Sequence, residues 1–264
     1  MSYLIIGSSS GLGRELAYTF AKNHNNLILV SRDERDLIPI QSDIEPKFGV
    51  KVKIIELDIT STEDIEKKIL LQKEMLLNLE GVMFPIGLMF EKDDLRLGDK
   101  EVSKILYANY LSIGYTIENL KHSYSDKNFL IVGFGSVSGL LGRNLNNYYS
   151  AAKRSLESHF ESLTFDNSKN KLRIHFYTLG YLDTNLAFGK KLSLPKGNVV
   201  SLANIVYKNK NKKIVKKYFP FYWSIIALIL KLTPLTIILK FKKLLKNCLL
   251  YTADASDDSL RVDL

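Results

Sequence analysis

Residues 3–13 read Tyr-Leu-Ile-Ile-Gly-Ser-Ser-Ser-Gly-Leu-Gly, and this stretch decides the fold. Its apolar start predicts a strand over 3–6, and a helical pattern of apolar residues follows over 12–22. The glycines fall in the turn between them, where the backbone can approach a pyrophosphate and the helix N-terminus offers free N–H groups. The stretch therefore predicts a dinucleotide-binding turn. The residues expected to contact the cofactor there are Gly7, Ser9, Gly11, Leu12 and Gly13.

Outward from this turn, short apolar runs alternate with helical patterns, which is typical of βαβ units on a parallel sheet. Strands are predicted at 3–6, 26–30, 50–57, 81–84, 128–134 and 173–178, and helices at 12–22, 62–79, 100–122 and 149–166. The run at 128–134 is apolar on both faces, as expected when helices cover both sides of a sheet. We predict an α/β fold with a doubly wound parallel sheet of Rossmann type over residues 1–200.

The chain has 264 residues and a net charge of +9, and the charge is concentrated in one region. Residues 208–250 contain eleven lysines and no acidic residue, whereas residues 1–207 contain 25 basic and 24 acidic residues. A nucleic-acid-binding protein would spread basic and aromatic side chains over a folded face, but these lysines flank an apolar segment. The pattern argues against nucleic acid as a partner and favours a peripheral contact with an anionic membrane.

Cysteine usage and the start of the chain bear on location. Cys248 is the only cysteine, so no intramolecular disulfide can form, and no cluster of Cys and His suggests a metal site. The N-terminus begins directly with a predicted strand and lacks the pattern of a secretory signal. We predict a cytoplasmic protein without a metal, associated with the inner face of the cytoplasmic membrane.

The end of the second predicted strand bears on the choice of cofactor. Enzymes that prefer NAD place a carboxylate there to hold the ribose hydroxyls, but this strand ends in Ser31-Arg32. Arg32, helped by Arg14 or Ser9, could pair with a 2′-phosphate. This favours NADPH over NADH. The alternative is an ordinary solvated surface arginine.

Tyr149 and Lys153 supply the chemistry. Helix residues four positions apart share a face, so Tyr149 lies beside Lys153, while Tyr148 points elsewhere. Tyr148 is expected to pack, with a contact to substrate or to a partner subunit as the alternative. Hydride transfer to a ketone develops negative charge on the carbonyl oxygen, which needs an O–H donor. A free phenol has a pKa of about 10, and a nearby ammonium group favours its ionised form. Tyr149 is therefore the predicted general acid in reduction.

With these motifs the sequence resembles the short-chain dehydrogenase/reductase family. The turn has the family's Gly-Xaa-Xaa-Xaa-Gly-Xaa-Gly form, and residues 149–153 match its Tyr-Xaa-Xaa-Xaa-Lys signature. Ser136 stands thirteen residues before Tyr149, a spacing that favours it over Ser138, and Asn109 matches the family's helix asparagine. The resemblance implies that Ser136 binds the substrate carbonyl, that Lys153 also holds the nicotinamide ribose, and that Asn109 anchors a water molecule.

Other family landmarks are retained in part. Asp58 and Ile59 match residues that contact the adenine, although Asp58 could equally serve as a cap or turn residue. The usual Asn-Asn-Ala-Gly is replaced by residues 84–87, Phe-Pro-Ile-Gly, where Gly87 still permits close approach to the cofactor. The usual Pro-Gly becomes Leu-Gly at 179–180, and Thr184 matches the threonine that contacts the nicotinamide carboxamide.

The tail has a composition of its own. Residues 218–230 are apolar, Lys231 and Pro234 interrupt the run, and an amphipathic basic stretch follows over 235–246. Because a spanning helix needs about 20 apolar residues, we predict a bent interfacial helical hairpin. Its aromatic residues Tyr218, Tyr222 and Trp223 suit a membrane interface. The alternative is a cap over the substrate pocket or an oligomer interface.

These expectations divide the chain into the catalytic domain 1–200, a helical segment 201–250 that binds membrane or caps the pocket, and an acidic tail 251–264. The segment resembles the C-terminus of bacterial reductases related to the keto-reductase subunit of decaprenylphosphoryl-ribose epimerisation. The predicted function is NADPH-dependent reduction of a ketone on a lipid-linked or cell-envelope sugar. Alternatives are a reductase of steroid-like or long-chain ketones and a non-catalytic dinucleotide sensor. The resemblance also makes a homo-oligomer through the Tyr149 helix possible.

Overall fold

A computed structural model describes residues 2–90, 93, 97–124, 126–142, 146–166, 171–183 and 195–240. Seven parallel strands form one sheet in the order β3-β2-β1-β4-β5-β6-β7. The strands are β1 (Ser2–Ile6), β2 (Asn26–Ser31), β3 (Val52–Glu56), β4 (Leu79–Phe84), β5 (Leu130–Ser136), β6 (Arg173–Leu179) and β7 (Ile214–Phe219). The strand order reverses between β1 and β4, so ligands are expected at the carboxyl ends of these two strands. The predicted doubly wound sheet is confirmed.

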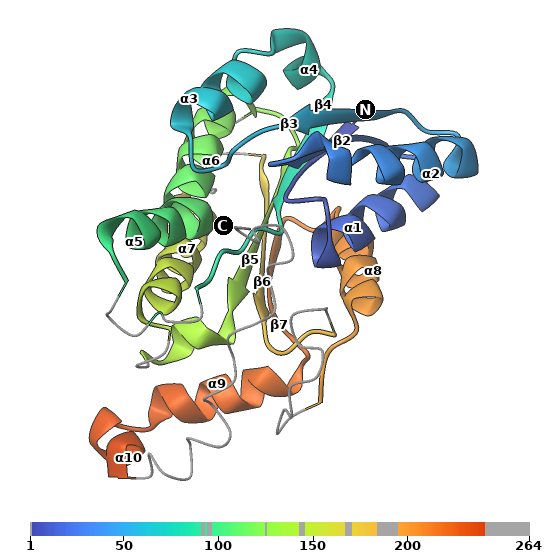
Figure 1. Ribbon diagram of the computed structural model, residues 1–264. Helices are drawn as coiled ribbons and strands as arrows, with labels where there is room; N and C mark the ends of the chain where they lie inside the picture. Colours follow the sequence, from blue (N-terminus) through green and yellow to red (C-terminus); the bar gives the residue numbers. More distant parts are fainter. Residues whose placement is uncertain are drawn as a thin grey trace.

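Helices cover both faces of the sheet (Figure 1). One face carries α1 (Gly11–Lys22), α2 (Ile38–Phe48) and α8 (Val199–Asn209). The other carries α3 (Thr62–Ile65), η2 (Glu66–Leu70), α4 (Lys73–Leu77), α5 (Asp99–Leu106), η3 (Tyr107–Leu111), α6 (Ser112–Tyr124) and α7 (Asn147–Asp166). Short turns η1 (Glu34–Asp36) and η4 (Val137–Leu140) follow β2 and β5. Beyond the carboxyl ends of the strands lie α9 (Tyr222–Leu232) and α10 (Leu235–Lys240).

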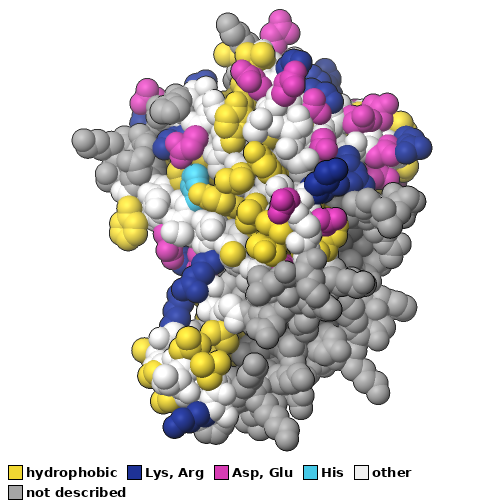
Figure 2. Space-filling model, turned by 60° about the vertical axis from the view of Figure 1, so that its left-hand side comes forward, with side chains coloured by type: hydrophobic (Ala, Val, Ile, Leu, Met, Phe, Trp, Pro, Cys, Tyr) yellow, Lys and Arg dark blue, Asp and Glu magenta, His cyan; other side chains and the backbone are white. Residues whose placement is uncertain are grey.

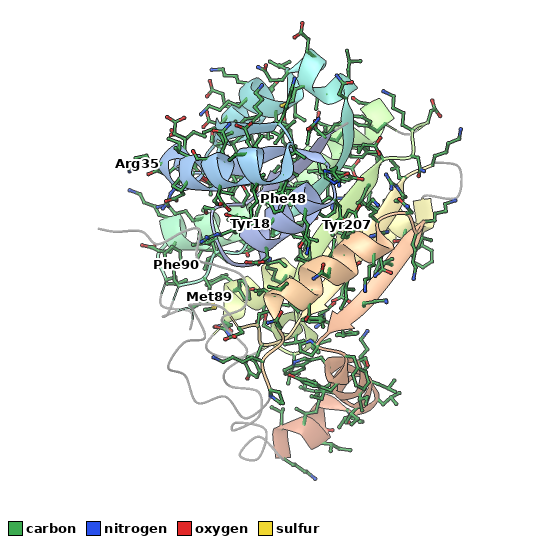
Figure 3. All side chains as sticks on the ribbon, turned by 90° about the vertical axis from the view of Figure 1, so that its right-hand side faces the viewer. Tyr18, Arg35, Phe48, Met89, Phe90 and Tyr207 are labelled. Atoms are coloured by element: carbon green, nitrogen blue, oxygen red, sulfur yellow. The ribbon has the colours of Figure 1, made fainter. Side chains whose placement is uncertain are left out.

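Successive strand residues point to opposite faces of the sheet, so they contribute to two separate hydrophobic cores. In β1, Tyr3 and Ile5 pack toward α1, whereas Leu4 and Ile6 pack toward α6 and α7. All seven residues of β5 are buried, which agrees with its apolar sequence on both faces. Aromatic residues labelled in Figure 3 extend the first core between helices: Tyr18 of α1 meets Phe48 of α2, and Tyr207 of α8 meets Phe20.

Several helices differ from the prediction. The helix expected over 62–79 is divided into α3, η2 and α4, and the one expected over 100–122 passes through the π turn η3. Helix α2 was not predicted, because Pro39 and Pro46 interrupt its pattern and only Ile40 and Ile44 are buried. Pro39 is tolerated because it lies in the first turn, where its missing N–H would have no partner.

The sheet also continues past residue 200. We expected 201–250 to be helical, but β7 pairs with β6 as a parallel strand and α8 packs on α1. Strand β7 was not predicted, because its sequence is rich in lysine and only Val215 in it is fully buried. Helices α9 and α10 do form, with a break at Thr233 and Pro234. Among the described residues, no helix is both long enough and apolar enough to cross a bilayer.

Candidate active site

The glycine turn is built by close backbone contacts. Gly7 and Gly11 adopt positive φ angles of 97° and 47°, which favour glycine. A Cβ atom on Gly13 would lie 1.8 Å from the carbonyl oxygen of Gly7, so helix and strand touch at this point. Ser10 precedes α1, and among the described residues its side chain makes no capping hydrogen bond to the amides that begin this helix. The first N–H groups of α1 are therefore suited to binding a phosphate.

A pocket beside this turn brings the predicted cofactor residues together. Gly7, Arg32, Asp58, Ile59 and Ile86 are among the residues that line it. These residues come from the ends of β1, β2, β3 and β4, which are far apart in the sequence. Asp58 also accepts hydrogen bonds from the Thr60 amide at 2.9 Å and the Thr60 hydroxyl at 2.8 Å. It therefore forms the turn that the alternative interpretation expected, while facing the pocket.

An acidic residue next to Arg32 is already engaged. Asp33 accepts hydrogen bonds from the backbone amide of Arg35 and from its guanidinium, with an Nε–Oδ1 distance of 2.9 Å. These hydrogen bonds lower the pKa of the Asp33 carboxyl to about 2. Figure 3 shows Arg35 at the outer edge of the molecule. Asp33 is thus bound to Arg35, and the positive charge of Arg32 adds to the lowering of its pKa.

The two candidate serines interact directly. Ser136 ends β5, and its Oγ lies 2.8 Å from Ser138 Oγ and 3.2 Å from the Ser138 amide nitrogen. Ser138 is fully buried, whereas Ser136 retains slight exposure. With Ser138 donating both hydrogen bonds, the Ser136 hydroxyl keeps its own proton for a substrate carbonyl. The structure therefore gives Ser138 an orienting position behind Ser136.

Lys153 is held by two strand ends. Its Nζ donates to the carbonyl oxygens of Ile86, at 2.7 Å, and Phe134, at 3.3 Å. The same atom lies 5.8 Å from the centre of the Tyr149 ring, and both side chains are almost completely buried. These contacts fix α7 against the carboxyl ends of β4 and β5, so the ammonium group stands beside the phenol as the spacing predicted.

Asn109 secures the adjoining segment. Its side chain accepts a hydrogen bond from the Leu88 amide at 3.1 Å and donates to the carbonyls of Leu88, at 2.7 Å, and Ile105, at 2.9 Å. Gly87 lies between Leu88 and Ile86, the partner of Lys153. Residues 84–87 replace the family's Asn-Asn-Ala-Gly. Lys153 and Asn109 thus bind the main chain on the two sides of Gly87. The π turn η3 places Asn109, as such turns often do at functional sites.

Sequence reasoning misplaced Trp223. We expected it at a membrane interface, but its side chain is completely buried, packed against Val137 and Tyr181. A Cβ atom on Gly180 would lie 1.8 Å from Trp223 Nε1, so the indole fills the space beside this glycine. Gly180 was recognised only as part of an altered Pro-Gly motif. Helix α9 was predicted, but its contact with Gly180 joins segments that are far apart in the sequence, so no local pattern indicates it.

One residue of the site was not predicted, and another cannot be placed. Asp93, which sequence reasoning missed, binds the first turn of α7 through its carboxylate. Its partners lie more than fifty residues away, so no local signal marks it. Thr184, the predicted nicotinamide contact, lies outside the described residues, as does the tail beyond 240.

Comparison with known proteins defines the class. Residues 2–192 match the family model for short chain dehydrogenases, and the chain belongs to this family. The predicted enzyme class, an NAD(P)-dependent short-chain dehydrogenase/reductase, is confirmed.

Individual relatives and a solved structure resemble the chain over most of its length. The chain is 28% identical over 242 residues to a very-long-chain 3-oxoacyl-CoA reductase of Vanderwaltozyma polyspora, covering 84% of this chain and 68% of the relative. It is 26% identical over 235 residues to hydroxysteroid 11-beta-dehydrogenase 1-like protein B of Xenopus laevis, covering 84% and 78%. A short-chain dehydrogenase from Sphingobium yanoikuyae, solved in complex with NADPH, superposes with a TM-score of 0.74 at 18% identity, covering 87% and 93%. This last likeness establishes the shared fold.

Proposed function

We propose that the protein is an NADPH-dependent ketone reductase in which Tyr149 is the general acid. The proposal rests on the fixed position of Lys153, which the carbonyl oxygens of Ile86 and Phe134 hold beside Tyr149. Ser136 ends the same strand that supplies one of these carbonyls. A buried ammonium group beside a buried phenol suits proton transfer to a ketone, and Ser136 supplies a hydroxyl donor at the end of β5.

The residues present fit the cofactor. The crowded contact between Gly7 and Gly13 leaves bare backbone at the start of α1, and the adjoining pocket joins Arg32 to Asp58 and Ile59. The glycine turn would hold the pyrophosphate and Arg32 the 2′-phosphate. Gly87, Lys153 and Thr184 would hold the nicotinamide end. When bound, NADPH supplies a hydride to the substrate.

The chain's own groups complete the reduction. Tyr149 donates its phenolic proton to the carbonyl oxygen as negative charge develops there, and Ser136 stabilises that oxygen by a hydrogen bond. Lys153 stabilises the phenolate that remains on Tyr149. Lys153 then passes a proton to the Tyr149 phenolate, and Asn109 anchors the water through which a solvent proton replaces the one that Lys153 gave up. In the oxidative direction Tyr149 acts as the base.

Arg32 should determine the preference for NADPH. Arg32→Ala is expected to weaken NADPH binding by tenfold or more, because a charge-assisted hydrogen bond contributes about 1.5–3 kcal/mol. NADH binding should stay unchanged, since NADH has no 2′-phosphate. Titration of both cofactors, monitored by fluorescence, measures this. Lys47→Ala is the matched control, because this exposed cation is paired with Asp43 and does not line the pocket. An equal loss for both cofactors would show that Arg32 does not recognise the phosphate.

The substrate is proposed to be a ketone carried by a hydrophobic or lipid-linked molecule. Support comes from α9, whose two faces differ. Trp223 and Ala227 are buried near η4, the turn that follows Ser136, whereas the opposite face is exposed and apolar. The exposed apolar residues of α9, α10 and the preceding turn are Phe221, Ile225, Leu228, Ile229, Leu232, Leu235, Ile237 and Leu239. In Figure 2 hydrophobic side chains gather on this lower lobe, with Lys or Arg side chains above and below them.

Two substrate classes remain candidates. The basic apolar tail favours a lipid-linked or cell-envelope sugar, and the named relatives favour a long-chain acyl or steroid ketone. NADPH oxidation should be compared with keto sugars from lipid-extracted bacterial envelopes, a long-chain 3-oxoacyl-CoA and an 11-ketosteroid. The ketone with the highest kcat/KM identifies the class. Turnover of small water-soluble ketones alone would contradict a hydrophobic substrate.

We further propose that α9 and α10 rest on the inner face of the cytoplasmic membrane. Residues 221–240 contain no acidic residue, and Lys231 and Lys240 are exposed beside the apolar face. Simultaneous replacement of Leu228, Ile229 and Leu232 by serine should reduce binding to phosphatidylglycerol-containing vesicles by more than tenfold. Each partly exposed apolar side chain is expected to contribute about 1 kcal/mol on insertion.

Vesicle co-sedimentation measures this binding. Leu77→Ser is the matched control, because Leu77 is 70% exposed on α4, away from the lobe. Unchanged vesicle binding by the triple variant would contradict the membrane contact and leave a pocket cap or an oligomer interface as the role of the lobe.

A further inference from the structure

The first turn of α7, which carries Tyr149, is held by one residue from a distant segment. The two carboxylate oxygens of Asp93 accept hydrogen bonds from the amides of Tyr148, at 3.0 Å, and Tyr149, at 2.9 Å. The carbonyl oxygen of Asp93 accepts from the Asn147 amide at 3.2 Å. The next amide, that of Ser150, is bound within the helix by Asn146. Asp93 thus binds all three leading amides of α7.

This cap is unusually enclosed. Asp93 is completely buried, and its backbone pairs with Asn146 as a short parallel bridge. A helix N-terminus carries partial positive charge, which stabilises a carboxylate placed against it. The two oxygens are used on successive amides, so a shift of either partner would break at least one hydrogen bond. The arrangement therefore fixes the main chain of Tyr149 in position and direction.

The segment that carries Asp93 also begins at the cofactor side of the site. It leaves β4 through Ile86 and Leu88, which are bound by Lys153 and Asn109. It then passes Met89 and Phe90, labelled in Figure 3, and the Phe90 carbonyl accepts from the Asp93 amide at 3.3 Å. One short segment therefore contacts the Lys153 side chain near its start and the Tyr149 amide near its end.

We propose that Asp93 is a positioning residue that sets the distance between Tyr149 and Lys153, by fixing the helix start while Ile86 fixes the ammonium group. This inference rests on the proposed function for its consequence in catalysis. Asp93→Asn tests it, because asparagine has nearly the same shape but only one oxygen that can accept an amide. One of the two carboxylate hydrogen bonds is lost, and an NH₂ group faces the other N–H.

Hydrogen exchange tests the hold on the helix without any substrate. In Asp93→Asn the amides of Tyr148 and Tyr149 should exchange at least tenfold faster, while amides in β5 stay unchanged. Glu45→Gln is the matched control, because Glu45 accepts a hydrogen bond from the Val52 amide at 2.8 Å, at the opposite end of the sheet. Exchange at Tyr148 and Tyr149 that matches the unchanged protein would overturn the proposal.

Kinetics separate positioning from general stability. With the ketone from the panel above that the unchanged protein reduces fastest, Asp93→Asn should lower kcat at least tenfold and leave the NADPH dissociation constant within twofold. Glu45→Gln should leave kcat unchanged. Equal kcat in Asp93→Asn and the control would overturn the proposal. If the unchanged protein reduces no ketone, the proposed function fails, and the exchange experiment still decides whether Asp93 holds the Tyr149 main chain.

Discussion

Tyr149→Phe is expected to lower ketone turnover by about 10²- to 10⁴-fold, the usual contribution of a positioned general acid. The substitution removes only the hydroxyl, and the ring keeps its buried place beside Lys153. Backbone contacts to Asp93 also remain, since they involve the amide. NADPH binding should therefore change little. Steady-state rates and cofactor titration on the same preparation measure both quantities.

Tyr148→Phe provides the matched control for this prediction. Tyr148 has the same side chain one position earlier, and it is only partly buried. Because adjacent helix residues point in different directions, its hydroxyl is not expected to reach the carbonyl. Its rate should remain within about twofold, since most surface substitutions have small effects. A larger loss in Tyr148→Phe than in Tyr149→Phe would reassign the acid.

Gly13→Ala should abolish tight cofactor binding. The added Cβ would lie 1.8 Å from the Gly7 carbonyl oxygen and 2.8 Å from its carbon, so the turn and α1 must separate. Overpacking of this kind costs about 1–3 kcal/mol, and misplacing the pyrophosphate site adds to the loss. We expect NADPH affinity to fall by about 100-fold or more, equivalent to roughly 2.8 kcal/mol. Cofactor titration and thermal unfolding of the variant measure the two effects.

Gly142→Ala is the control for the added methyl group. Among the described residues, nothing lies within 4 Å of a Cβ built at Gly142, and this residue does not adopt the positive φ angles of Gly7 and Gly11. Its NADPH affinity should therefore equal that of the unchanged protein. Normal NADPH binding by Gly13→Ala would refute the close strand-to-helix contact at the turn.

The parts of the site that were predictable are encoded by neighbouring residues. The glycine spacing between β1 and α1 and the four-residue spacing of Tyr149 and Lys153 are local patterns, and the structure places each on the expected element. The pocket brings together Arg32, which was predicted from the end of the second strand, and Asp58 and Ile59, which the family resemblance implied.

The features that sequence reasoning missed depend on distant partners. Strand β7 is stabilised by pairing with β6, and its own sequence is too rich in lysine to indicate burial. The sequence around Trp223 is typical of a membrane interface, and only its packing against the distant Gly180 shows that its side chain is buried. Asp93 binds α7 across more than fifty residues. The roles of Thr184, the tail beyond residue 240 and a homo-oligomer through α7 stay predictions.

The most direct test is to measure NADPH oxidation and alcohol formation together, in the purified full-length protein with the hydrophobic ketone panel. We predict one alcohol formed for each NADPH oxidised with at least one of these ketones, and loss of both signals in Tyr149→Phe. Tight NADPH binding without oxidation by any ketone would contradict the account and indicate a dinucleotide-sensing protein that retains the fold without turnover.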